Sequence, residues 1–415
     1  MRPERITLLE NKRIILAVTG SIAVYKAVDL ASKLTQAGSA VDVIMTEAAQ
    51  KFVAPITFQS VTGRSVYTHL WQAASGVSLP THIAHVGLGE GADLMGIIPA
   101  TANTMAKLAH GLADDLLSVT ALAARCPVVI APAMDGGMYE HTATQANVAT
   151  LIERGAYLIE PEEGRFASGL VGRGRLPETT TLIGHIRQIL GRDGALQGRK
   201  VVVTAGGTRE AFDPVRFITN HSSGKQGYAL AQAALDAGAR VTLISTTRTL
   251  PVPVGAMLVP VDSTQDMLDA VLAQTQDADA LVMAAAVSDF RPATKAEQKI
   301  KKSADDSAGL TVTLVRNPDI LQTVKARRDA TGSPRVVVGF AAESENLLEH
   351  AQDKLRRKGL DLIAANDITA TDAGFAADTN RVILLDKDGS QEILELMTKA
   401  MVSERIIERV ALLLG

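Results

Sequence analysis

The sequence predicts an α/β protein built from two doubly wound domains with mostly parallel sheets. Apolar residues make up 47% of the 415 residues and charged residues 21%, which is typical of a globular chain with a large core. Aromatic residues are only 3%, a composition that suits thin Val/Ile strands covered by Ala/Leu helices better than it suits a β-sandwich. At about 150 residues per domain, the length favours two or three domains.

The strand–helix–strand opening of such a domain occurs twice. Residues 13–46 and 200–246 each contain a β-branched run, a glycine-containing turn, an Ala/Leu helix that ends in Ala-Gly, and a second apolar run. Gly38 and Gly238 follow these helices, where a left-handed cap is expected. The returning strand should then lie parallel to the first.

Further strands follow in each half. The candidates are ADLMGIIPAT and CPVVIAPAM in the first half, and ADALVMAAAV, RVVVGFAAE and DLIAANDI in the second. Between the halves, ILGRDGALQGRK combines three glycines with charge, as a solvated linker does. We therefore predict a first domain over 1–190, a linker over 191–199 and a second domain over 200–415. The tail 392–414 has helical apolar spacing and should close the fold.

Charge and cysteine content exclude several classes of protein. Lys+Arg 42 against Asp+Glu 45 gives a net charge of −3, so no global positive field favours nucleic acid or an anionic membrane. The single cysteine, Cys126, cannot form an internal disulfide. The N-terminus has no apolar signal segment, and no stretch reads as a membrane span. We expect a cytoplasmic protein.

In open parallel sheets, ligands bind at the carboxyl ends of the strands, so the turns there are the candidate sites. Thr19–Ala23 forms the first such turn, where helix amides and a hydroxyl could hold a phosphate. Pro99–Thr104 is a second, with Thr101 as the cap of a helix that runs to Gly111. Each turn could equally be a plain structural cap. Asp114–Ser118 starts the next helix, where acids are usually partners of the helix dipole.

The first half resembles the FMN-binding cysteine decarboxylase family. The resemblance rests on GSIAVYKA, ADLMGIIPATANTMAKLAHGLADDLLS, CPVVIAPAMD and GRFASGLVGRGRLPE. It implies a Rossmann-like flavoprotein domain in which FMN transiently oxidises the cysteine moiety, CO2 leaves and the hydride returns. The implied FMN-binding residues are Gly20, Ser21, Ile22, Thr46, Pro99, Ala100, Thr101, Asn103, Ser118, Ala133 and Met134.

The same resemblance implies catalytic residues and a substrate clamp. His85, ahead of the LG..ADL segment, matches the essential histidine, and His82 is the nearby alternative. Two positions depart from the family pattern. Asp135 stands where PAMN has Asn, and Ser168 stands where the clamp usually has the proton-donating Cys, so the proton donor stays open. The implied clamp residues are Arg165, Ser168, Gly169, Arg173 and Arg175.

The second half resembles the CTP-dependent phosphopantothenate-cysteine ligases. The resemblance rests on GGTREAFDPVRFITNHSSGKQG, AAAVSDFRP, KIKK, NPDI, GFAAE and KLRRKGLDLIAANDI. Amide formation from a carboxylate needs an activated acyl group, here an acyl-cytidylate, with Mg²⁺ and cations on the phosphates. The resemblance implies that Asn220 and Lys299 are catalytic and that Asp289 holds the nucleotide or its metal. The implied CTP-binding residues are Met283, Ala284, Ala285, Asp289, Lys299, Pro318, Asp319, Ile320, Leu321, Phe340, Lys354 and Lys358.

The fused halves are similar to the bifunctional enzymes of bacterial coenzyme A biosynthesis. The implied reactions join 4'-phosphopantothenate to L-cysteine with CTP and then decarboxylate 4'-phosphopantothenoylcysteine to 4'-phosphopantetheine. The resemblance also implies a homo-oligomer of trimeric flavin domains and dimeric ligase domains. One alternative keeps the ligase but makes the flavin half a non-catalytic binding module, because of Asp135 and Ser168. Another is a nicotinamide-dependent reductase, although neither opening turn has a clean GxGxxG.

Overall fold

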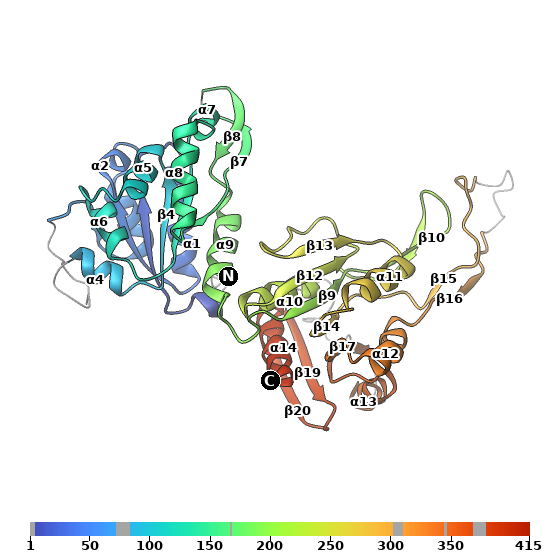
Figure 1. The fold of residues 1–415 in the computed structure, drawn as a ribbon. Helices are drawn as coiled ribbons and strands as arrows, with labels where there is room; N and C mark the ends of the chain where they lie inside the picture. Colours follow the sequence, from blue (N-terminus) through green and yellow to red (C-terminus); the bar gives the residue numbers. More distant parts are fainter. Residues whose placement is uncertain (1–4, 72–83, 167, 302–309, 344–346, 368–378) are drawn as a thin grey trace. The chain divides into compact units, whose positions relative to one another are not determined.

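The computed structural model describes residues 5–71, 84–166, 168–301, 310–343, 347–367 and 379–415. The chain divides into two compact units, Met1–Leu190 and Gly191–Gly415, and each is an α/β sandwich around one main sheet (Figure 1).

The first unit is built on a six-stranded sheet in the order β3-β2-β1-β4-β5-β6, with every pairing parallel. The order reverses direction between β1 and β4, which is the switch point of a doubly wound fold. Its strands are β1 (Arg13–Val18), β2 (Ala40–Met45), β3 (Val66–Tyr67), β4 (Leu94–Ala100), β5 (Val128–Pro132) and β6 (Tyr157–Leu158). A separate antiparallel hairpin follows, with β7 (Glu162–Arg165) and β8 (Val171–Arg175).

Helices cover both faces of this sheet because βαβ crossovers place them there. One buried cluster packs α1, α3 and α9 against the sheet, and a second packs α4, α5, α6 and α8 on the other face. The bounds are η1 (Thr7–Leu9), α1 (Val24–Gln36), α2 (Glu47–Gln50), α3 (Pro55–Thr62), α4 (Ala84–Glu90), α5 (Ala102–His110), α6 (Leu116–Ala123), α7 (Gly136–Tyr139), α8 (Thr142–Glu153) and α9 (Thr179–Gly191).

The second unit repeats this plan on an eight-stranded sheet in the order β13-β12-β9-β14-β17-β18-β19-β20. The pairings are parallel as far as β18, and β19 and β20 are antiparallel. The bounds are β9 (Lys200–Ala205), β12 (Arg240–Ser245), β13 (Met257–Pro260), β14 (Ala280–Met283), β17 (Val336–Glu343), β18 (Leu362–Asp367), β19 (Thr379–Asp386) and β20 (Gln391–Thr398). Two hairpins stand outside the sheet, β10 (Arg209–Ala211) with β11 (Phe217–Thr219), and β15 (Phe290–Pro292) with β16 (Leu314–Arg316).

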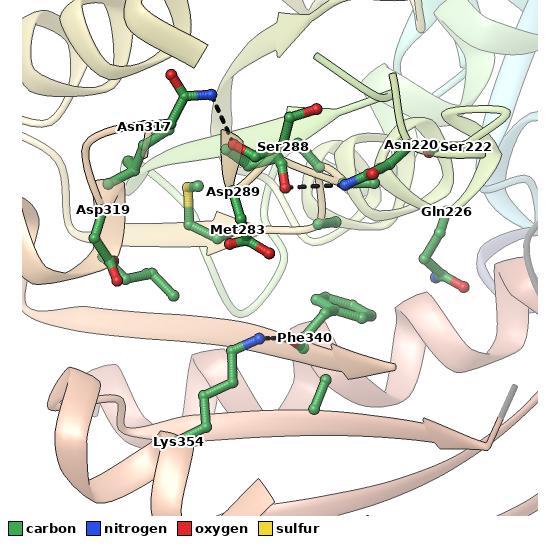
Figure 2. A pocket seen from close by; sticks show the side chains of 18 of the residues that line it. Asn220, Ser222, Gln226, Met283, Ser288, Asp289, Asn317, Asp319, Phe340 and Lys354 are labelled. Carbon is green, nitrogen blue, oxygen red and sulfur yellow. Dashed lines mark hydrogen bonds between the residues drawn. The ribbon is translucent and has the colours of Figure 1, made fainter. Parts of the chain in front are cut away.

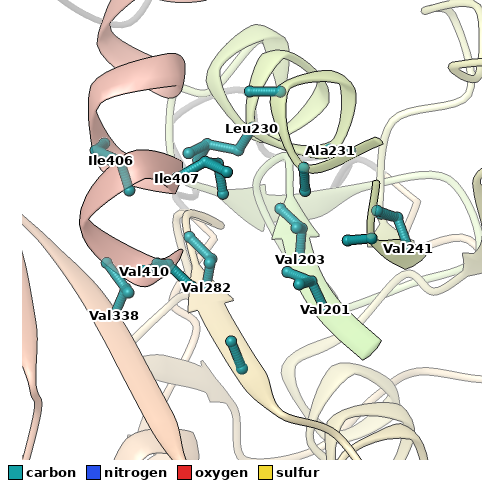
Figure 3. Packing of buried hydrophobic residues seen from close by; sticks show 14 of the residues in the cluster. Val201, Val203, Leu230, Ala231, Val241, Val282, Val338, Ile406, Ile407 and Val410 are labelled. Carbon is teal, nitrogen blue, oxygen red and sulfur yellow. The ribbon is translucent and has the colours of Figure 1, made fainter. Parts of the chain in front are cut away.

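The helices of this unit again lie on two faces. α10 (Lys225–Asp236) and α14 (Lys399–Leu414) cover one face, where Leu230, Ile406 and Val410 pack on the valines of β9, β14 and β17 (Figure 3). α11 (Thr264–Gln274), α12 (Ile320–Thr331) and α13 (Leu347–Lys358) cover the other face. The sheet therefore lies between two helical layers, as in a doubly wound fold.

The predicted α/β class with mostly parallel sheets is confirmed. Gly38 and Gly238 have φ values of 105° and 89°, as expected for left-handed caps. Thr101 caps α5, and Gly111 ends it in the left-handed conformation. The fully helical tail predicted for 392–414 is wrong in its first third, because residues up to Thr398 form the strand β20 and the helix begins at Lys399.

Residues 191–199 differ from the solvated linker expected there. Leu196 is fully buried in the core of the second unit, and its N–H donates to Ala237 O at 2.7 Å. A Cβ on Gly191 would lie 2.3 Å from Asp236 O, so the segment packs closely on the end of α10. The glycines permit this close approach as well as marking a boundary.

Candidate active sites

The first site lies at the switch point between β1 and β4. The buried Thr19 hydroxyl donates to Pro99 O at 2.7 Å and accepts from Thr101 N at 3.0 Å, so it ties the two strand ends together. Ser21 Oγ donates to Ala133 O at 3.2 Å and thereby links this turn to the end of β5. Three strand ends of small residues thus meet at one edge of the sheet.

Most residues predicted to bind FMN belong to this edge. Gly20, Ser21 and Ile22 follow β1, and Thr46 follows β2. Pro99 and Ala100 end β4, Thr101 and Asn103 come just after it, and Ala133 and Met134 follow β5. Ser118 is placed differently, because its hydroxyl completes the capping box of α6 with Asp115. Burial opposes charge on Asp115, but hydrogen bonds from Ser118 and Lys107 outweigh it and hold the pKa of that carboxyl below its usual value.

The predicted clamp is the β7–β8 hairpin, which reaches over the end of β5. Met134 N donates to Gly174 O at 3.0 Å, and a Cβ on Gly174 would lie 2.3 Å from Met134 O. Cβ atoms on Gly136 or Gly172 would each lie 3.2 Å from the Phe166 ring. Gly172 and Gly174 therefore allow the hairpin to pack closely on the segment after β5, which carries Asp135.

The hairpin brings together the two residues that depart from the family pattern. Ser168 Oγ donates to Asp135 Oδ2 at 2.7 Å across 33 positions of sequence. The other carboxylate oxygen of Asp135 accepts from Gly137 N at 3.3 Å, so Asp135 also caps α7. The two substitutions therefore form one hydrogen-bonded pair.

The clamp arginines are exposed, and Arg173 is already ion-paired. Its Nη2 lies 2.8 Å from Glu160 Oε2, and its guanidinium lies 5.8 Å from the Tyr139 ring centroid. Burial, with the hydrogen bond to Glu160, raises the pKa of Tyr139 to about 12. Arg175 crosses Gly164, where a Cβ would lie 2.6 Å from its Cδ, and Arg165 and Gly169 stay exposed.

His85 lies in the first turn of α4 and is partly exposed. Among the described residues, no hydrogen bond joins it to Asp135 or Ser168, which bond to each other. His82 falls outside the described residues. Burial raises the pKa of Cys126 to about 11. Cys126 also lies just before β5, at the opposite end of this strand from the carboxyl edge of the sheet. Its thiol is thus a poor substitute for the clamp acid.

The second site is a cavity of about 1000 Å³ at the carboxyl edge of the second sheet. Figure 2 shows Asp289, Met283 and Phe340 between Asp319 and Lys354 on one side and Asn220 and Gln226 on the other. Every predicted CTP-binding residue except Lys299 lines it: Met283, Ala284, Ala285, Asp289, Pro318, Asp319, Ile320, Leu321, Phe340, Lys354 and Lys358.

Two lysines of α13 supply positive charge to this cavity. Lys354 Nζ donates to Phe340 O at 2.7 Å, and the buried Lys358 pairs with Asp319. Burial opposes charge on Asp319, but the hydrogen bonds from Lys358 and Gln322 N lower the pKa of the carboxyl overall. As predicted, lysines four residues apart share one helix face, and both reach the cavity.

Hydrogen bonds of two asparagine side chains fix other loops that line the cavity. Asn220 Nδ2 donates to Val287 O at 3.1 Å, and Asn317 Nδ2 donates to Ser288 O at 2.8 Å. The Gly206 turn lies beside the start of α10, since a Cβ on Gly224 would lie 3.5 Å from Gly206 N. The glycine turn predicted to lie near a helix end is therefore found there.

Lys299 is exposed on the segment between β15 and β16, and it does not line the cavity formed by the described residues. The structure thus separates it from the other predicted ligase residues.

Sequence reasoning missed other cavity residues, among them Gln226, Asn366, Asn380 and Lys399. Gln226 Nε2 donates to Ser403 Oγ at 2.8 Å, which joins α10 to α14 beside the cavity. Lys399 is buried at the first position of a helix, where a cation opposes the helix dipole. That misplaced charge is the signal that could have revealed it.

The described residues also bear on metal binding and on membranes. They contain no group of three or more His, Cys, Asp or Glu side chains placed to hold a metal. In the same ranges, no helix has the length and apolar character needed to cross a membrane.

Two mostly parallel sheets, each with polar residues gathered at its carboxyl edge, define an α/β protein with two candidate ligand sites. Residues 4–191 match the flavoprotein family, and residues 196–413 match the DNA/pantothenate metabolism flavoprotein C-terminal domain family. The chain belongs to the bifunctional coenzyme A biosynthesis protein family, with a flavoprotein decarboxylase domain and a ligase domain.

Curated relatives cover both domains. The coenzyme A biosynthesis bifunctional protein CoaBC of Bacillus subtilis is 46% identical over 98% of this chain and 98% of its own length. The protein of that name from Mycolicibacterium smegmatis is 45% identical over 97% of each chain. A crystal structure of the C-terminal domain of such a protein is 39% identical, covers 53% of this chain and 98% of its own, and has a TM-score of 0.45.

Proposed function

We propose that the second unit joins 4'-phosphopantothenate to L-cysteine with CTP, and that the first unit then decarboxylates 4'-phosphopantothenoylcysteine to 4'-phosphopantetheine. The observation that supports this most is the cavity of the second unit, which gathers eleven of the twelve residues implied for CTP. The proposal includes a homo-oligomer and a cytoplasmic location, both of which stay predictions.

In the ligase half, the two ends of the cavity would bind different parts of the reacting molecules. Lys354 and Lys358 would hold the triphosphate on the α13 side. The acyl group would then lie toward Asn220, whose amide is fixed by Val287 O and leaves its carbonyl oxygen to orient an incoming group. Amide formation would take place between these ends, near Asp289.

Magnesium fits this cavity as an ion shared with the nucleotide. Mg²⁺ is commonly bound through one or two carboxylates plus substrate phosphates rather than in an all-protein cage. Asp289 lines the cavity as an exposed carboxylate, and the described residues form no larger cluster of ligands. Bound there, the ion would neutralise phosphate charge during acyl transfer.

FMN fits the edge of the first sheet because small residues line three adjoining strand ends. Thr101 caps α5 at that edge, and a helix N-terminus favours a phosphate. When bound, FMN supplies the transient oxidation that makes loss of CO2 easy. The protein's own part would be to hold the substrate under the β7–β8 hairpin, with His85 and the Asp135–Ser168 pair moving protons.

Lys358→Gln should weaken CTP binding roughly tenfold to a hundredfold, because it removes a buried charge-assisted contact from the cavity. Titration calorimetry with CTP and Mg²⁺ measures this. Arg356→Gln is the matched control, since Arg356 is exposed on the same helix and does not line the cavity. Equal affinities for Lys358→Gln and the unchanged protein would place the triphosphate elsewhere.

The Asp135–Ser168 contact predicts coupled effects on decarboxylation. A thiol protonates an enethiolate more readily than a hydroxyl does, but at position 168 it would lie beside the Asp135 carboxyl and not beside the amide of the family pattern. Ser168→Cys alone should therefore gain little, whereas Asp135→Asn with Ser168→Cys should restore the family pair and keep activity. The rates at which the two single variants and the double variant release 4'-phosphopantetheine give the coupling between residues 135 and 168. Additive effects would show that the residues act independently.

A further inference from the structure

The loop between β10 and β11 forms hydrogen bonds with the segment that carries Lys299. Ala296 N donates to Phe212 O at 3.0 Å, and Ile300 N donates to Asp213 Oδ2 at 3.2 Å. Arg216 Nη2 donates to Ile300 O at 2.7 Å. The loop therefore holds the backbone on both sides of Lys299, three residues before it and one residue after it.

Asp213 is the centre of this arrangement. Its side chain is fully buried, with 1% of the residue exposed. Oδ1 accepts from Val215 N at 2.8 Å and from Arg216 N at 2.7 Å, and Oδ2 accepts from Arg216 Nε at 2.9 Å as well as from Ile300 N. One carboxylate thus shapes its own loop and binds the neighbouring segment.

This network needs a charged carboxylate. Burial by itself would raise the pKa of Asp213, but the N–H groups of Val215, Arg216 and Ile300 and the Arg216 guanidinium lower it to about 2. The carboxylate is therefore ionised over the whole working pH range. A neutral amide in its place would keep the shape but present an NH₂ group where donors now converge.

The same hairpin also leads to the ligase cavity. β11 ends at Thr219, and the next residue, Asn220, lines the cavity. Thr219 Oγ1 donates to Thr208 O at 2.7 Å, which ties this strand end to the turn after β9. The position of the Lys299 segment is thus set relative to the strand that positions Asn220.

We infer that Asp213 is a positioning residue of the ligase reaction, which fixes the segment bearing Lys299 through the Asp213–Ile300 hydrogen bond and the Asp213–Arg216 pair. This inference rests on the proposed function, in which Lys299 acts on the acyl-cytidylate. It assigns no chemical step to Asp213 itself, whose side chain is enclosed.

The test is Asp213→Asn in the full chain, followed through both half-reactions with labelled CTP and cysteine. Turnover of the acyl-cytidylate should fall by roughly a hundredfold, the scale expected when a reacting group is misplaced by about 1 Å. Formation of the acyl-cytidylate and the affinity for CTP should stay unchanged. The double variant Asp213→Asn/Lys299→Gln should be no slower than Lys299→Gln alone, because both changes remove the same contribution, that of Lys299.

Asp361→Asn is the matched control for stability. Asp361 is equally buried, and it accepts from Val337 N at 2.9 Å and pairs with Arg328 and Lys387 at the other end of the strands. If Asp213→Asn does not fold, Ile300→Pro removes the same N–H donor from the Lys299 segment and should slow the same half-reaction. Normal turnover in the folded variant, or equal loss in both half-reactions matched by Asp361→Asn, would overturn the inference. Absence of CTP-dependent product from the unchanged protein would instead refute the proposed function.

Discussion

His85→Asn should stop the formation of 4'-phosphopantetheine and leave ligation intact. A neutral imidazole can accept and return a proton near pH 7, whereas a carboxamide cannot. Removal of such a group typically costs 10²–10⁴-fold in rate, so the decarboxylated product should be close to undetectable in a short assay. Mass spectrometry of the products from 4'-phosphopantothenoylcysteine without CTP measures this directly.

His110→Asn is a suitable control for this change. His110 lies in the last turn of α5 and is exposed, so the same substitution there should leave both activities in place. Flavin absorbance must be equal in the two variants, which separates loss of chemistry from loss of cofactor. Decarboxylation by His85→Asn at the unchanged rate would transfer the role to another group.

Lys299→Gln should abolish amide product while acyl-cytidylate still forms. A fixed cation that stabilises developing charge is worth about 10²–10³-fold, and glutamine keeps most of the length without the charge. The intermediate should therefore accumulate to the amount of enzyme present, as seen after acid quenching with labelled CTP.

Lys295→Gln provides the comparison, because Lys295 is also exposed on the segment between β15 and β16. The Lys295→Gln variant should turn over the acyl-cytidylate normally, because we expect the reaction to need a cation at position 299 and not simply positive charge on this segment. Normal turnover by Lys299→Gln would show that the exposed placement of Lys299 in the structure is also its working state.

The fold could be predicted because its signals are local. Thr101 and Gly111 bound one helix by their own backbone preferences, and the repeated strand–helix–strand pattern fixes a parallel sheet. The strand β20 was missed because its apolar residues also fit helical spacing. Its pairing with β19 is a tertiary interaction that no single segment reports.

The candidate sites were predictable only as far as strand ends. Parallel strands carry their carboxyl ends to one edge, so Asp289 and Phe340 could be expected in one site. The Ser168–Asp135 bond and the Asp213–Ile300 bond join residues 33 and 87 positions apart. Their formation depends on how hairpins fold over the sheet, which residue spacing does not determine. The same reason explains why Lys299 was expected in the cavity but lies outside it.

The measurement that tests the whole account most directly uses L-cysteine labelled with ¹³C at its carboxyl carbon. The purified chain receives this cysteine with 4'-phosphopantothenate, Mg²⁺ and CTP, and labelled CO2, CMP and 4'-phosphopantetheine are followed together. We expect labelled CO2 to appear after a lag, in step with 4'-phosphopantetheine and only when CTP is present. Accumulation of 4'-phosphopantothenoylcysteine with FMN bound and no labelled CO2 would contradict the account, and would make the first unit a non-catalytic flavin module.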